Sequence, residues 1–333
     1  MSLLRRLAWA GACALGLHHA ARSRNRHRLL IVCYHGVARP GDDPHWLLMP
    51  AAEFERQLAY LARHYRVRPM DDALADLWAG RIAVPTACIT FDDGYRNNLT
   101  EALPRLEAAG LPATIYLATG LVGTTRRLWT TEIDLACVAT RAPSIAIDGL
   151  IAPIPIPGDR TGRLAVADRL KGVLKSLPAV RRRAAHSALL EGMGIDSVQD
   201  AGTFAIMSWD DVRTMEESGG VTFGGHTIEH DIVSRLDDTD VEHEIGGSMR
   251  DVASRCSRPT STFAYPNGTA ADFDARSAAA VAGAGGTAAV TTIEGLNDAG
   301  TDRFALRRIT LGGSVGFDEF RVRVSGLRES SAP

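Results

Sequence analysis

The residues of this sequence best suited to chemistry are two adjacent carboxylates and a pair of imidazoles. Asp92 and Asp93 follow a short apolar run and precede a glycine. His226 and His230 stand four residues apart after another such run, so one helical turn would bring both imidazoles to a single ion. Two histidines and one carboxylate make a facial metal site with open positions for water. Alone, the Asp pair would equally fit a solvated turn.

Two further apolar runs end in residues that bear on such a site. The segment 263–268 contains a Tyr-Pro-Asn-Gly turn, whose backbone amides are suited to face a developing oxyanion. His35 directly follows the run 29–34, where it is either a satisfied core histidine or a catalytic acid. The remaining histidines lack ligand spacing, and we interpret them as surface or structural residues.

An α/β framework must position these motifs. Strand-like apolar runs alternate with helical stretches, and the runs are continuous, as in strands buried on both faces of a mostly parallel sheet. Ligands bind at the C-terminal ends of such strands, which is where the motifs lie. Residues 124–206 interrupt this alternation of strands and helices with several prolines and two basic helical segments. We interpret them as an insertion at one face of the sheet. The apolar runs are 29–34, 87–91, 113–118, 221–225, 261–265 and 287–292.

Charge is distributed unevenly along the 333 residues. Residues 1–28 hold six arginines and no acid, which leaves 31 of the 37 basic side chains and all 39 acidic ones in residues 29–333. With more acidic than basic side chains, residues 29–333 lack the basic face that phosphate backbones require. We therefore expect no nucleic-acid partner and a neutral or cationic substrate. The five cysteines form no close pairs, and we expect buried free thiols.

The leader, residues 1–28, combines an apolar run with flanking arginines. The run is shorter than the ~20 residues of a spanning helix, and we expect an amphipathic helix in peripheral contact with an anionic membrane surface. A frayed basic extension and an export signal are the alternatives. The corresponding location is cytoplasmic or inner-membrane-associated, with export to the cell envelope as the alternative.

In combination, three motifs resemble those of the polysaccharide deacetylase family, also called carbohydrate esterase family four or the NodB-homology domain. They are Thr-Phe-Asp-Asp-Gly at 90–94, His-Thr-x-x-His at 226–230 and Tyr-Pro-x-Gly at 265–268. The resemblance covers about residues 30–308 apart from the insertion. It implies a distorted (β/α)7 barrel with a helical insertion, residues 29–333 as one catalytic domain, and metal-dependent removal of acetyl groups from sugar polymers. The Tyr-His-x-Val strand at 34–37 is similar to a branch of the family with rotated motif order.

The same resemblance implies a role for each motif residue. The segment 306–309 contains no histidine, so the acid that protonates the leaving amine is expected at the first strand. Position 264 is alanine where the family has arginine, so the partner of the catalytic carboxylate must come from elsewhere. Asp231 replaces a family proline and is either a partner of a ligand or a solvated turn residue. The implied assignments are Asp92 as base, His35 as acid, Asp93, His226 and His230 as metal ligands, the Tyr265 amide as oxyanion donor and Arg308 as partner of the base.

We therefore expect one divalent metal ion, Zn, with Ni or Co as alternatives. The substrate is expected to be a glycan or lipid-linked oligosaccharide with N-acetylhexosamine units, in exopolysaccharide or cell-envelope metabolism. Trp46 and Trp129 are candidates for stacking on a sugar ring. Two alternatives are a hydrolase of small non-sugar amides and a non-catalytic carbohydrate-binding module, although a binding module has no need of paired carboxylates.

Overall fold

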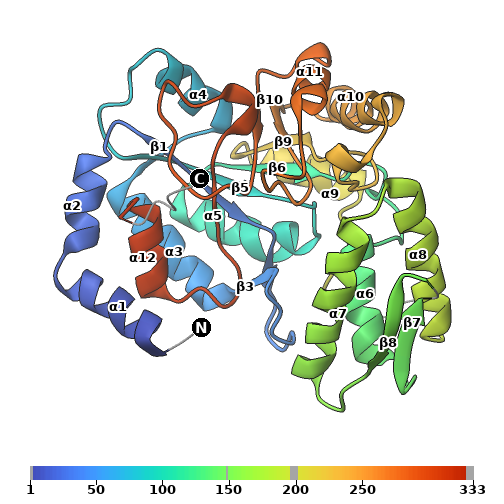
Figure 1. The fold of residues 1–333 in the computed structure, drawn as a ribbon. Coiled ribbons are helices and arrows are strands. Elements are labelled where there is room, and N and C mark those ends of the chain that lie inside the picture. Colours follow the sequence, from blue (N-terminus) through green and yellow to red (C-terminus); the bar gives the residue numbers. More distant parts are fainter. Residues whose placement is uncertain (1–2, 148, 196–201, 328–333) are drawn as a thin grey trace.

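A curled sheet of parallel strands forms the centre of the protein in the computed structural model, which describes residues 3–147, 149–195 and 202–327 (Figure 1). The strand order is β11-β10-β9-β6-β5-β1-β12, with β4 paired to β5. These strands are β1 (Leu29–Tyr34), β4 (Arg66–Val67), β5 (Thr86–Phe91), β6 (Ala113–Leu117), β9 (Val221–Gly225), β10 (Pro259–Ala264), β11 (Ala288–Val290) and β12 (Ile309–Thr310).

Six of the eight strands lie where the continuous apolar runs predict them, whereas the two-residue strands β4 and β12 were not predicted. Every residue of β1, β5 and β6 is buried, because helices cover one face and the barrel interior the other. The segment 306–310 brings the two ends of the sheet together, since Val290 bridges Leu306 and β12 pairs with β1. The expected distorted (β/α) barrel is thereby confirmed.

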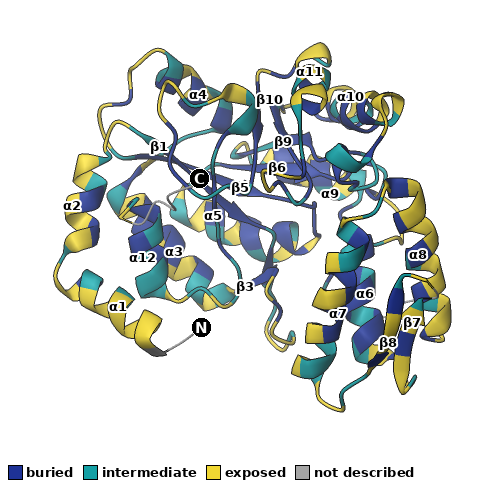
Figure 2. Cartoon of the chain, in the orientation of Figure 1, coloured by how far each residue is buried: buried dark blue, intermediate teal, exposed yellow. Residues whose placement is uncertain are grey.

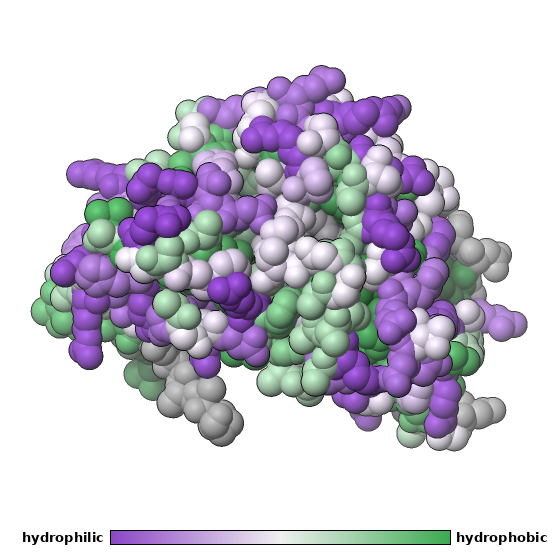
Figure 3. Space-filling model, turned by 90° about the horizontal axis from the view of Figure 1, so that it is seen from above, coloured by the Kyte–Doolittle hydropathy of each residue, from purple (hydrophilic) through white to green (hydrophobic). Residues whose placement is uncertain are grey.

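Helices surround the sheet, with α4, α10 and α11 above it and α3, α5 and α12 below it in Figure 1. Seen from above, the rim is mostly hydrophilic and the middle less polar (Figure 3). Small strands β2 (Gly36–Ala38) and β3 (Leu48–Pro50) pair with each other. The helices of the body are α3 (Ala51–His64), α4 (Met70–Trp78), η1 (Asn98–Ala102), α5 (Leu103–Ala109), α9 (Trp209–Glu217), η2 (Val233–Arg235), α10 (Asp238–Arg255), α11 (Ala275–Gly283), η3 (Arg303–Ala305) and α12 (Phe317–Val324).

The segment expected as an insertion builds a lobe with a hydrophobic core of its own, at the lower right of Figure 1. Its proline-rich stretch, for which the sequence predicts no strand, forms the antiparallel hairpin β7–β8. Pro153 and Pro155 occupy exposed positions on β8, where a missing amide hydrogen costs little. The lobe consists of α6 (Trp129–Ala139), β7 (Ser144–Ile147), β8 (Ile151–Pro155), α7 (Arg160–Lys175) and α8 (Ala179–Gly192).

The leader forms two helices, α1 (Leu3–Ala14) and α2 (Leu17–Arg24), which lie against α12. Gly16, with φ of 70°, separates them. Arg22 donates a 2.7 Å hydrogen bond to the Tyr60 hydroxyl, which fastens α2 to α3. Most of α1 is exposed (Figure 2), and among the described residues no helix has the length and apolarity needed to cross a membrane. All five cysteines are free and buried, as expected.

Candidate active site

Asp92 and Asp93 emerge together from the C-terminal end of β5 and are both buried. The turn that follows requires glycine, because Gly94 has a φ of 79° and a Cβ there would lie 2.8 Å from the Leu117 side chain. Asp93 itself has a φ of 76°, a left-handed conformation that is unfavourable outside glycine. The strained turn sends the two neighbouring carboxylates to different partners.

Asp92 forms a bidentate ion pair with Arg308. Its Oδ1 accepts from Nη1 at 2.7 Å and its Oδ2 from Nη2 at 2.6 Å, with both side chains buried. Burial alone would raise the pKa of Asp92, but the Arg308 guanidinium holds that pKa below its usual value. Asp92 is therefore an ionised carboxylate with a fixed orientation, and Arg308 occupies the place that the sequence analysis expected for the partner of the base.

His226 and His230 converge on Asp93 from the loop after β9. Their Nε2 atoms lie 3.5 Å and 3.3 Å from Asp93 Oδ1. Burial alone would raise the pKa of Asp93, but hydrogen bonding to the two imidazoles lowers it well below its usual range. The loop is strained as well, since Thr227 and His230 have φ values of 62° and 56°. Asp93 and His230, which come from two different loops, thus both have left-handed backbones. Such strain is typical of a functional site.

The donor chemistry of the cluster fits a cation. His226 Nδ1 lies 2.7 Å from the Ala264 carbonyl oxygen, so Nδ1 carries a proton and the lone pair of neutral His226 is on Nε2. That lone pair faces a carboxylate oxygen, and two acceptors in this position need a positive charge between them. The ligand atoms of Asp93, His226 and His230 all lie within 4.8 Å of one another, as one metal ion requires.

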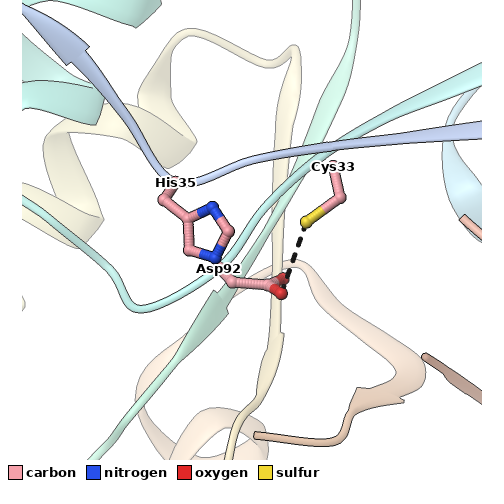
Figure 4. Close-up of side chains that lie close together, drawn as sticks. All are labelled: Cys33, His35 and Asp92. Atoms are coloured by element: carbon pink, nitrogen blue, oxygen red, sulfur yellow. Dashed lines mark hydrogen bonds between the residues drawn. The ribbon is translucent and has the colours of Figure 1, made fainter. Parts of the chain in front are cut away.

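His35 lies beside the other carboxylate (Figure 4). Ligand atoms of Cys33, His35 and Asp92 lie within 4.8 Å of one another, and the Cys33 thiol donates to Asp92 Oδ2 at 3.4 Å. Burial raises the pKa of Cys33 well above its usual value, so the thiol stays protonated. Burial also lowers the pKa of His35, and His35 Nδ1 has no hydrogen-bond partner in the described part of the chain. His35 is thus a neutral imidazole at the cavity wall, next to Asp92.

The expectation for Tyr265 is corrected by the structure. The Tyr265 amide donates to the Val290 carbonyl at 3.2 Å within the sheet, and its ring stacks on Phe273, so this amide is not free to bind an oxyanion. Asn267, two residues later, lines the cavity in a left-handed conformation with φ of 62°. Its backbone amide donates to no acceptor in the described segments, so this amide, unlike that of Tyr265, is available as a donor.

Asp231, left open between a partner of a ligand and a solvated turn residue, is buried, and its hydrogen-bond partners in the described residues are arginines rather than a ligand. It receives hydrogen bonds from Arg182 and Arg183 on α8, the second at 2.8 Å. These bonds tie the residue after His230 to the insertion lobe. The loop that carries both imidazoles is therefore held by the lobe as well as by the sheet.

A cavity of about 330 Å³ joins these groups. Trp46, which is 49% exposed, lies at the boundary between it and a groove of about 610 Å³, and its ring meets His35 edge to face at 5.3 Å between centroids. Trp129 lies in the wall but is buried under Arg182. Sequence reasoning missed the polar residues that the lobe and the loop before β3 bring here, because only the fold makes them neighbours. These residues are His45, Thr130, Asp134, Lys171 and Lys175.

A parallel barrel with an ionised, arginine-held carboxylate beside an Asp-His-His cluster has the architecture and the groups of a metal-dependent enzyme site. Residues 81–146 and 185–288, together about half of the chain, match the family model described as polysaccharide deacetylase. The chain therefore belongs to the polysaccharide deacetylase family and is a hydrolase acting on carbon–nitrogen bonds other than peptide bonds.

Solved structures of deacetylases share the fold at low sequence identity. The Streptococcus pyogenes deacetylase PplD in complex with acetate has a TM-score of 0.58 and 15% identity, covering 89% of this chain and 98% of that one. IcaB from Ammonifex degensii has a TM-score of 0.55 and 17% identity, with 90% and 97% covered. A de-N-acetylase from Aggregatibacter actinomycetemcomitans has a TM-score of 0.53 and 15% identity, with 88% and 98% covered. No curated protein matches the chain.

Proposed function

We propose that this deacetylase removes acetyl groups from N-acetylhexosamine units of a glycan, in exopolysaccharide or cell-envelope metabolism, and depends on one divalent metal ion. The observation that carries the proposal is the pairing of an arginine-held carboxylate with the Asp93, His226 and His230 cluster in one cavity. The Tyr-His-x-Val strand at 34–37 supports placement in the family branch with rotated motif order. One relative in fold is a de-N-acetylase, which supports an amide substrate by analogy.

Asp93, His226 and His230 would hold the metal, and Zn suits this set of one carboxylate and two imidazoles, with Ni or Co as alternatives. A divalent ion held by these residues would supply Lewis acidity, which lowers the pKa of water and polarises an acetamide carbonyl. Asp92 is ionised and fixed by Arg308, so it accepts the proton that the attacking water loses. The Asn267 amide supplies a donor for the oxyanion that develops on the acetyl carbonyl.

The leaving amine needs a proton, and His35 is the group we assign to deliver it. Because burial lowers the pKa of His35, the imidazole is neutral before the reaction begins. Asp92, whose carboxylate lies within 4.8 Å, collects a proton from water and can pass it to His35. His35 then donates it to the amine. In these transfer steps the proton that the attacking water loses is the proton that the leaving amine gains.

We also propose a peripheral membrane contact for the leader, and hence a cytoplasmic or inner-membrane-associated location. Leu4, Leu7 and Leu15 on and after α1 are exposed by 79%, 60% and 77%, next to Arg5 and Arg6. Exposed leucines beside arginines are the composition of a helix that lies on an anionic lipid surface. Finding that the native protein has lost residues 1–28 would favour export instead.

The experiment that tests the proposed function combines metal analysis with acetate release. Purified protein should contain about one divalent ion per chain and release acetate from N-acetylhexosamine oligomers. His226→Ala and His230→Ala should each lose the metal and the activity together. Retention of metal in both variants would contradict the ligand assignment, and metal-loaded protein that releases acetate only from small non-sugar amides would contradict the substrate class.

A further inference from the structure

The chain contains only two lysines among its 333 residues, against 35 arginines, and both line the active-site cavity. Lys171 and Lys175 stand four residues apart on α7. This helix belongs to the segment 147–184, which the family model leaves unmatched. A lysine ammonium is a compact point charge on a flexible stem, unlike the rigid planar fork of arginine. Its occurrence only at this place points to a specific use.

Lys171 has a structural task. Its Nζ lies 2.5 Å from Asp134 Oδ1 and 3.0 Å from Asp168 Oδ1, and its side chain is buried. The other oxygen of Asp134 lies 3.2 Å from His45 Nε2. This network joins α7 to α6 and to the loop before β3. Lys171 is therefore neutralised and unavailable to a ligand.

Lys175 differs because its partner is neutral. Its Nζ donates to Asn267 Oδ1 at 2.6 Å, and in the described part of the chain it forms no ion pair with a carboxylate. The Asn267 amide is oriented for this bond, since its Nδ2 donates to Asp272. Burial lowers the pKa of Lys175, and neighbouring Lys171 adds to the effect. The carboxylates of Asp272, Asp168 and Asp134 oppose this decrease of the pKa only from a distance. A partly buried cation without a carboxylate in contact is costly unless a ligand supplies one.

The carboxylates of the cavity are already engaged. Asp92 is paired with Arg308, Asp93 faces two imidazoles, and Asp134 is paired with Lys171. The Thr269 and Thr292 hydroxyls of this wall already donate to Asp272 Oδ2 and to the Asn267 carbonyl oxygen, so their protons are not available to an oxyanion. The Thr130 hydroxyl also lines the cavity, and an oxyanion could accept from it as well as from the ammonium group.

We propose that Lys175 anchors a subsite for an anionic substituent of the substrate glycan, a carboxylate or a phosphate group close to the reacting acetamide. The inference rests on the proposed deacetylase function and narrows its substrate class. The excess of acidic side chains in residues 29–333 favours neutral or cationic substrates at long range, but the unpaired charge inside the cavity decides what binds there. Lys175, the residue that anchors this subsite, belongs to helix α7 of the insertion lobe.

Kinetics on three matched substrates test this subsite in the metal-loaded enzyme. The substrates are a neutral N-acetylhexosamine oligomer, the same oligomer with a neighbouring uronic acid, and a phosphate ester of N-acetylhexosamine. We expect kcat/KM to be higher for one charged substrate than for the neutral one. Whichever charged substrate is preferred shows whether the subsite binds a carboxylate or a phosphate. Lys175→Met should lower the ratio of charged to neutral kcat/KM by about ten- to a hundredfold, mainly through KM.

Two further variants separate charge from structure. Lys175→Arg should retain part of the preference, because it keeps the charge. Arg169→Met removes a positive charge from the exposed side of the same helix and should leave the ratio unchanged. An equal loss of kcat/KM on all three substrates in Lys175→Met would overturn the proposal, since it would indicate a general role in the reaction or in folding.

A binding measurement distinguishes failure of the subsite from failure of the proposed reaction. With only two lysines, acylation by an amine-directed reagent can be followed by mass spectrometry of the peptides that carry them. Lys175 should react faster than buried Lys171, and a charged sugar, but not a neutral one, should slow its acylation. Protection without acetate release would support the subsite and reject the reaction. Acetate release with neither protection nor charge preference would reject the subsite and keep the reaction.

Discussion

The two neighbouring carboxylates of the site differ in their partners. Arg308 is buried and bidentate, so it fixes Asp92 as an anion, whereas Asp93 faces two imidazoles, whose ring nitrogens can share a cation with it. Removing one member of a buried ion pair such as Asp92–Arg308 typically costs about 3–5 kcal/mol. Arg308 is thus important for both stability and orientation of the base.

Substitution of each carboxylate should therefore give a different phenotype. Asp92→Asn should keep the metal but lower kcat by about 10² to 10⁴, because it removes the proton acceptor. Asp93→Asn should instead weaken metal affinity, since a charged ligand is lost. Metal titration and acetate release on the same preparations measure both effects. If the two phenotypes are exchanged, the roles of base and ligand must be exchanged too.

The role of His35 can be tested by comparing two substrates whose leaving groups differ in their need for a proton. His35→Gln should leave metal binding intact and lower kcat for an acetamide, whose amine departs only with a proton. The loss should be smaller for an aryl acetate, because phenolate leaves without one. Parallel kcat measurements on the two substrates decide the matter. Equal losses would make His35 a structural residue of the cavity wall.

At the residue scale, sequence reasoning located the carboxylates and histidines because they lie within five residues of the ends of buried strands. Strand ends in a parallel sheet meet at one edge, so type and spacing were sufficient. The Tyr265 amide was misjudged because the hydrogen bond of one backbone group depends on where β10 ends. Lys175 could not be placed, since its approach to Asn267 joins positions 92 residues apart.

At the scale of elements, the longer strands of the sheet were predictable within a few residues, and exceptions have local causes. The hairpin β7–β8 was missed because prolines argue against strands, yet an exposed two-stranded ribbon tolerates them. The leader was expected as one helix, but Gly16 divides it and side-chain hydrogen bonds join it to the body. Asn25, for example, donates to the Ser325 carbonyl at 3.0 Å.

This attachment of the leader should depend on pH through His18. The His18 side chain is buried at 1% exposure, and neither ring nitrogen has a partner in the described residues. Burial, followed by the charges of His19, Arg321, Arg22 and His64, lowers the pKa of His18 to about 4. The unfolded leader binds this proton more tightly than the folded one. The contribution of neutral His18 to the stability of the attached leader is therefore fully present above pH 6.5. It is lost as the pH falls towards 4, by up to about 3 kcal/mol.

Hydrogen exchange of residues 17–24 measures the effect. Exchange should accelerate between pH 7 and pH 5 relative to the core strands, and His18→Leu should remove most of this acceleration. His243→Gln, which changes an exposed histidine, serves as the matched control and should behave like the parent. An unchanged pH dependence in His18→Leu would assign the effect to another group.

At the scale of the whole molecule, the reaction cavity continues into a longer groove. The cavity of about 330 Å³ and the groove of about 610 Å³ share Trp46 and Asp134. The segment 38–52 forms one wall of the groove, and Leu164 and Asp168 on α7 form the other. The body and the insertion lobe thus shape one continuous binding surface, suited to several linked sugars rather than to a single residue.

This continuity predicts that activity increases with the length of the glycan and that Trp46 carries part of the increase. Trp46 is half exposed between cavity and groove, where its ring is free to stack on a sugar face. Trp46→Ala should lower kcat/KM for a pentasaccharide by about three- to tenfold, through KM, and affect a monosaccharide less. Trp46→Phe should retain much of the length dependence, because an aromatic face remains. Equal losses on short and long substrates would show instead that Trp46 acts through its contact with His35, since only a ring that binds sugars beyond the reaction site can distinguish chain lengths.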